Sequence, residues 1–318
     1  MSSDSTTLAS NIRTTFGKVQ DRIDLLFFAP VSAIRLDLFR RCFTLTFLAY
    51  MAFRFTHARE WLTDFGYHST SLTIHPGYPA PWPTLPAAWI IPFGILIFGS
   101  GLIVIAGFLP RFMSGILFAC SFYVMHVDWT TSYTLNKLYL VTFLVLALSP
   151  SIQRSSSGDD AEHFVQVAWP IRILQATLLL QYFTAGTCKV FHGDWNFSHP
   201  DVLWTHVQGT YRTALAGFML QKLPKFMWTI MMFGSLAFEL TAPLLFTRKR
   251  LIWIGIAWGI LFHISIALTM HNLIYFSIQM MSFYILWLPD NLLQRFADWL
   301  PQLQLGGKRV DLIATSAP

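Results

Sequence analysis

Four ionisable side chains in apolar parts of the sequence are the first candidates for chemistry: Arg54, Lys189, Glu239 and His263. A charge inside an apolar bundle is costly and is normally tolerated only when it is paired or functional. Lys189 is the most informative, because a lysine shielded from water gives up its proton more easily and can then act as a base. The alternative, which position alone favours, is a lysine whose ammonium group reaches the membrane surface.

Further polar residues lie beside these candidates. Asp194 and Trp195 follow Lys189 closely, and Asp128 and Asn136 flank a turn between two apolar segments. We expect Glu239 to pair with Arg54 or with a histidine, and a role in proton relay is the alternative. His263 is suited either to orienting an oxyanion or carboxylate near a pocket, or to a hydrogen bond between helices.

The composition indicates which elements position these side chains. Of 318 residues, 54% are hydrophobic and 12% are charged, and the mean hydropathy is +0.50, which is more apolar material than a soluble core of this size buries. A crossing helix needs roughly 20 mainly apolar residues. Hydropathy therefore predicts an all-α integral membrane protein, a bundle of about eight transmembrane helices. The predicted spans are 37–56, 88–108, 111–127, 134–150, 170–189, 226–246, 251–270 and 272–288. An alternative with seven spans and one re-entrant segment remains, because hardly any loop separates the last two predicted spans.

Three segments follow from this pattern. Residues 1–34 are expected to form a cytoplasmic N-terminal segment, 35–290 the transmembrane domain and 291–318 a cytoplasmic tail. The N-terminal segment has an apolar stripe at helical spacing, which predicts an amphipathic helix lying in the membrane interface or docked on a neighbouring subunit. The stripe consists of Ile12, Phe16, Val19, Ile23 and Leu26. A polar linker is expected at 155–160.

Lysine and arginine are distributed unequally between the two ends of the predicted spans. This asymmetry predicts that both termini lie in the cytoplasm, and the short loops fit a bacterial inner membrane. The formal charge of +6 then reflects topology and contact with anionic lipids, and no nucleic-acid-binding module is visible. The three cysteines all fall inside predicted spans, so neither a disulfide framework nor a metal site is expected. Without an inverted repeat, a transporter has no support.

Several motifs together resemble a known family. The string from Gln181 to Lys189, followed by Asp194-Trp195, resembles the Tyr-Phe-x-Ala-Gly-x-x-Lys and Asp-Trp signature of the vitamin K-dependent gamma-glutamyl carboxylase and of the related horizontally transferred transmembrane (HTTM) domain. The resemblance covers about residues 35 to 290. It extends in the same order to three further segments, which are Asp128–Tyr139, Phe238-Glu239 and Phe262-His263.

The resemblance implies a chemistry for Lys189. In the animal carboxylase the corresponding lysine is thought to deprotonate vitamin K hydroquinone, whose reaction with oxygen yields a base that abstracts a glutamate proton before CO2 adds. Lys189 would then be the base and His263 a second polar group, with Tyr182, Phe183 and Trp195 lining a reduced-quinone site. Asp128, Asn136, Asp194 and Glu239 are further pocket candidates.

Two departures leave another function open. Leu135 and Asn136 stand where the animal enzyme has a histidine, and only about 30 residues follow the last predicted span, too few for its lumenal substrate-binding domain. The chain therefore also resembles accessory membrane proteins of the sporulation-delaying type, which assist export or maturation of a small peptide. The expected partners are membrane lipids and either a peptide or protein substrate or a separately encoded protein.

Overall fold

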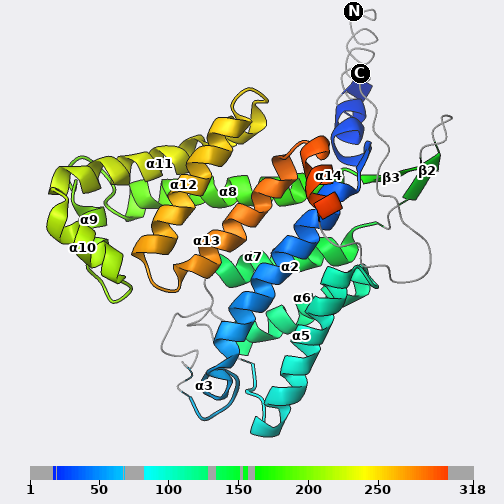
Figure 1. The fold of residues 1–318 in the computed structure, drawn as a ribbon, viewed down its shortest axis with the longest axis horizontal. Helices are drawn as coiled ribbons and strands as arrows, with labels where there is room; N and C mark the ends of the chain where they lie inside the picture. The colour runs from blue at the N-terminus through cyan, green and yellow to red at the C-terminus, as the bar shows by residue number, and fades with distance from the viewer. Residues whose placement is uncertain are drawn as a thin grey trace, which may run out of the picture.

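A computed structural model describes residues 17–18, 20–66, 68, 82–127, 134–150, 153–156 and 162–299 of the chain. Helices dominate it (Figure 1). In chain order they are α2 (Ile34–Phe55), α3 (Ala58–Leu62), η1 (Ala87–Trp89), α5 (Ile90–Ala106), α6 (Pro110–Val127), α7 (Thr134–Leu148), α8 (Trp169–His192), α9 (Val202–Val207), α10 (Ala214–Lys222), α11 (Lys225–Thr247), α12 (Ile252–Thr269), α13 (Leu273–Ser282), η3 (Phe283–Trp287) and α14 (Asp290–Trp299).

Each predicted span coincides with a helix, but the helices differ in length and polarity. Within the part of the chain that the structure describes, three are long and apolar enough to cross a membrane, namely Ala87–Ala106, Lys225–Thr247 and Ile252–Thr269. Two apolar stretches are shorter, Thr134–Leu148 and Leu273–Trp287. At 1.5 Å per residue, the 15 residues of α7 extend only about 22 Å, less than the roughly 30 Å of a hydrocarbon core.

The centre of the bundle is packed with aromatic rings. Phe39, Phe43 and Phe47 recur every fourth residue of α2 and are fully buried, because this spacing puts them on one helix face. The ring of Phe47 lies 4.8 Å from that of Tyr139 in α7, and the ring of Phe39 lies 5.1 Å from that of Phe283 in η3. Helix α2 therefore packs between α7 and η3.

A small antiparallel sheet departs from the expected all-α fold. Its strands are β1 (Pro30–Ser32), β3 (Glu162–Val167) and β2 (Gln153–Ser156), in that order. The register pairs Pro30 with Val167 and Gln153 with Val165. The expected linker at 155–160 was therefore wrong at its start, since Ser155 and Ser156 belong to β2. Strands this short carry no clear sequence period, and their pairing depends on where α2 and α8 begin.

The sheet marks one end of the bundle. β1 leads into α2, β2 follows α7 and β3 leads into α8, so these three helix ends meet there, while α3 lies at the far end of α2 (Figure 1). At the sheet end Arg41 donates to Asp37 at 2.8 Å and to the backbone carbonyl of Ile105, which ties α2 to the last turn of α5.

Both flanking segments pack on the bundle. β1 belongs to the expected N-terminal segment, and α14 packs on α2 through Leu293 and an ion pair of 2.8 Å between Arg35 and Asp290. Of the expected amphipathic helix, residues 17–18 and 20–28 are helical, and Ile23 and Leu26 are about half exposed. The remaining stripe residues, Ile12, Phe16 and Val19, lie outside the described residues.

The tight connection between α12 and α13 is made by Met270, His271 and Asn272. Asn272 has a φ of 65°, a left-handed conformation that asparagine tolerates better than most residues. The backbone N–H of His271 donates to the carbonyl of Tyr211 at 2.6 Å. This turn is therefore anchored to the segment between α9 and α10.

Candidate functional site

One face of α8 carries the residues from which the site is built. Tyr182, Gly186 and Lys189 follow one another at intervals of four and three, so they line the same face of the helix. A Cβ added at Gly186 would lie 3.1 Å from the Cβ of Glu239 and 3.0 Å from Cδ2 of Leu240. Glycine at this position therefore lets α8 and α11 approach closely enough for Lys189 to reach Glu239.

Lys189 and Glu239 form an ion pair between these helices. Nζ of Lys189 donates to Oε1 of Glu239 at 2.5 Å. The Lys189 side chain is 28% exposed and the Glu239 side chain only 5%, so the amine is within reach of the surface and the carboxylate is not. The expectation that Glu239 pairs with Arg54 or a histidine was wrong. The Arg54 guanidinium instead stacks over the Trp61 ring, 4.1 Å from its centroid.

Aromatic rings surround the amine. Nζ of Lys189 lies 4.7 Å from the centroid of the Trp195 ring and 5.9 Å from that of Phe262. The turn after α8 folds back to bring Trp195 there, because its backbone N–H donates to the carbonyl of Lys189 at 3.2 Å. Asp194 makes this turn possible with a φ of 57°, and it is itself exposed. Trp195 can therefore stabilise the ammonium by a cation–π contact.

A second polar layer lies deeper in the bundle. The Tyr182 hydroxyl is 2.7 Å from Nε2 of His263 in α12 and 2.7 Å from the Tyr284 hydroxyl in η3. All three side chains are buried. Gly259 makes room for this arrangement, because a Cβ there would lie 2.1 Å from the Tyr284 hydroxyl oxygen. The layer joins α8, α12 and η3.

The three side chains can share their protons in two directions. Either Tyr284 donates to Tyr182 and Tyr182 donates to Nε2 of His263, or Nε2 of His263 donates to Tyr182 and Tyr182 donates to Tyr284. Among the described residues, neither Nδ1 of His263 nor Oε2 of Glu239 has a hydrogen-bond partner, although both atoms are buried. His263 thus makes the contact between helices through Nε2, and its Nδ1 has no partner among the described residues.

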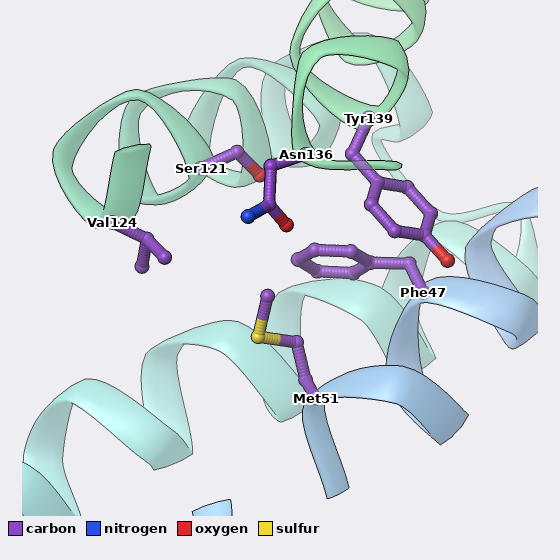
Figure 2. Close-up of a pocket in the computed structure, with 6 residues that line it drawn as sticks. All are labelled: Phe47, Met51, Ser121, Val124, Asn136 and Tyr139. Atoms are coloured by element: carbon purple, nitrogen blue, oxygen red, sulfur yellow. The ribbon is translucent and has the colours of Figure 1, made fainter. Parts of the chain in front are cut away.

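Two other expected site residues, Phe183 and Asn136, lie apart from this cluster. Phe183 is 45% exposed on another face of α8. Asn136 is buried in α7 and, as Figure 2 shows, points into a gap between α2, α6 and α7. That gap is too narrow to admit a water molecule. Asp128 lies outside the described residues. The gap is lined by Phe47, Met51, Ser121, Val124, Asn136 and Tyr139.

Two residues of the site, Tyr284 and Phe262, were not among the site residues predicted from the sequence. The signal for Tyr284 was a hydroxyl in an apolar segment, which must find a partner when it is buried. The described residues contain no group of three histidine, cysteine, aspartate or glutamate side chains that could hold a metal ion.

Comparison with known proteins gives no relative. No family model, no curated protein and no solved structure matches this chain. The site must therefore be interpreted from its own geometry.

Proposed function

We propose that this chain is a polytopic membrane enzyme of the HTTM type, which uses Lys189 as a base toward an acidic hydroxyl at the external face of the membrane. The observation that carries the proposal is the Lys189 amine, which is held at the end of α8 between a buried carboxylate and the Trp195 ring. A lysine merely reaching for the membrane surface needs neither contact.

The proposed membrane arrangement has about eight crossings. The connections from α5 to α6, from α11 to α12 and from α12 to α13 are short turns, and the sheet gathers the start of α2, the end of α7 and the start of α8 at one end. Most lysine and arginine residues flank that end, which favours placing it, and both termini, in the cytoplasm of a bacterial inner membrane. The ion pair then belongs to the opposite, external end. The positive charge at the sheet end suits anionic lipids as partners.

The residues around Lys189 fit a reduced quinone. The amine keeps two N–H bonds beyond the one donated to Glu239, and Trp195 and Phe262 offer aromatic faces beside it. Tyr182 is occupied by its own hydrogen bonds and Phe183 points elsewhere, so Trp195 and Phe262 are the better ring contacts. When bound, a reduced quinone supplies an acidic hydroxyl and a ring that reacts with oxygen. Lys189 binds and deprotonates that hydroxyl, and the flanking rings exclude water.

Binding of menadiol, a small naphthohydroquinone, tests this proposal. The purified protein in lipid nanodiscs is dialysed against menadiol under nitrogen, and bound menadiol is measured for three variants. Lys189→Ala should weaken binding by about tenfold or more, because it removes a charged hydrogen-bond donor. Lys189→Arg should retain binding but not deprotonation, since arginine keeps its proton. Lys222→Ala, on the exposed side of α10, is the matched control and should bind as the unmodified protein does.

A second candidate function has its own support. The segment between α8 and α11 exposes large aromatic side chains, including Phe197 at 87% and Phe218 at 58%. Such a surface suits contact with a small apolar peptide, as an accessory protein for peptide export or maturation requires. If the unmodified protein fails to retain menadiol, the enzymatic proposal falls and this accessory role takes its place.

A further inference from the structure

Glu239 is poorly solvated for a carboxylate. Its side chain is 5% exposed, and its neighbour in sequence, Phe238, is fully buried. Oε1 accepts one hydrogen bond, from Lys189, and Oε2 accepts none from the described residues. Carboxylates buried in proteins are normally held by several donors. Among the described residues, the Lys189 ammonium is the single hydrogen-bond donor to this carboxylate.

The resting pair also limits what Lys189 can do alone. An ammonium group that donates to a carboxylate at 2.5 Å already carries its full set of protons. It can accept another proton only after one has left. The group in contact with Nζ that can take that proton is Oε1 of Glu239. Transfer along this bond also neutralises the buried carboxylate, which is favourable in apolar surroundings.

We infer that Glu239 is the final acceptor of the proton that Lys189 removes from its substrate. This inference rests on the proposed function and deepens it. The N–H bond of Lys189 that points at Glu239 breaks and an O–H bond forms on Oε1. The free amine then takes the hydroxyl proton of the substrate, leaving an oxyanion beside a restored ammonium. The overall change moves one proton from the substrate hydroxyl to Glu239, and Lys189 ends with the protons it began with.

Other groups near the amine are not placed for this role. Nε2 of His263 is engaged with Tyr182, and no described hydrogen bond joins the histidine to Lys189. Asp194 is exposed in the turn after α8. Gly186, in contrast, fixes the spacing of α8 and α11 at the position where Glu239 meets Lys189. Glu239 is therefore a positioning residue for Lys189 as well as its proton acceptor.

The test compares Glu239→Gln with Glu239→Asp in nanodiscs. Glutamine keeps the shape of the side chain and a hydrogen bond to Lys189 but cannot take a proton, whereas aspartate can. The first measurement is menadiol bound at equilibrium. The second is the shift in its ultraviolet absorption that accompanies loss of a hydroxyl proton. Glu60→Gln is the matched control, because the Glu60 side chain is 63% exposed on α3. Size-exclusion chromatography reports whether each variant stays folded.

Glu239→Gln should bind menadiol within about threefold of the unmodified protein, while the absorption shift falls by about tenfold or more. Glu239→Asp should recover part of the shift, and Glu60→Gln should change neither quantity. A full shift in Glu239→Gln would overturn the inference and leave Lys189 as the sole base. If the unmodified protein binds no menadiol, the proposed function fails together with the inference. If Glu239→Gln does not elute as a folded protein in size-exclusion chromatography, the Glu239→Asp variant provides the test. Normal menadiol binding without an absorption shift in Glu239→Asp would then overturn the inference.

Discussion

The hydroxyl oxygen of Tyr284 occupies the space in which a side chain on residue 259 would begin. A Cβ at Gly259 would lie 2.1 Å from that oxygen. Gly259 is one helical turn before His263 in α12, so the same close approach brings Tyr284 into the chain formed with Tyr182 and His263. The deeper polar layer of the site therefore depends on a glycine.

Gly259→Ala should destabilise the protein by about 1–3 kcal/mol, because the added methyl group overpacks a fully occupied position. The measurement is thermal unfolding in detergent, followed by tryptophan fluorescence. Gly234→Ala in α11 is the control, since a Cβ there meets nothing within 4 Å. That control should be neutral or slightly stabilising, as alanine favours helix over glycine. Equal stability of the two variants would contradict the described contact.

Tyr182→Phe should be more destabilising than Tyr284→Phe. The first change leaves both Nε2 of His263 and the Tyr284 hydroxyl without a partner. The second change removes only the Tyr284 hydroxyl, and the hydrogen bond between Tyr182 and His263 remains. Each unsatisfied buried group costs about 1–3 kcal/mol. Denaturant titration of both variants checks the order, and Tyr211→Phe, at a residue 55% exposed, should have no effect. The reverse order of stability would mean that Tyr182 does not hydrogen-bond to both His263 and Tyr284.

The two single substitutions that break the ion pair between Lys189 and Glu239 should lower the stability of the protein by different amounts. Glu239 is 5% exposed, so Lys189→Ala leaves a buried carboxylate without its counter-ion, a change that costs about 3–5 kcal/mol in fully buried pairs. Glu239→Ala should cost less, because Lys189 is 28% exposed and can turn to water. The double variant should recover part of the loss seen in Lys189→Ala. Additive losses in this cycle would show that the two side chains are not coupled.

The proposed orientation can be tested with cysteine variants in a background without native cysteines. A membrane-impermeant maleimide added to intact cells should label Lys222→Cys in α10, at the external end. Lys249→Cys, in the turn between α11 and α12, should react only after the cells are opened. Both residues are exposed, so access and not burial decides the outcome. The opposite pattern would invert the topology.

Local sequence patterns predicted the helices but not how they meet. Apolar runs place α5, α11 and α12 within a few residues, because hydrophobicity over roughly 20 residues is a local property. The partner of Glu239 could not be predicted, since the choice between Lys189 and Arg54 depends on which helices pack together. The short strands β1 and β3 were missed for the same reason, as each is stabilised by a segment distant in the chain.

The candidate site was predicted in part. Lys189 and Glu239 were predicted because an ionisable group in an apolar segment is costly unless it is paired or functional. The structure brings the two side chains together. Trp195 joins them through a backbone turn. Phe183 follows Tyr182 directly and so points to a different helix face, which the motif alone did not reveal. Tyr284 required knowing that Gly259 opens the space beside it.

Photolabelling tests the central claim most directly, because it reports where a quinone binds. The protein in nanodiscs is illuminated with a reduced azido-naphthoquinone, with and without excess menadiol, and the labelled peptides are identified by mass spectrometry. Label that menadiol displaces should fall on the peptides containing Trp195 and Phe262, the two rings beside the Lys189 amine. Displaceable label confined to the gap beside Asn136 and Tyr139, or absent altogether, would contradict a quinone site at Lys189.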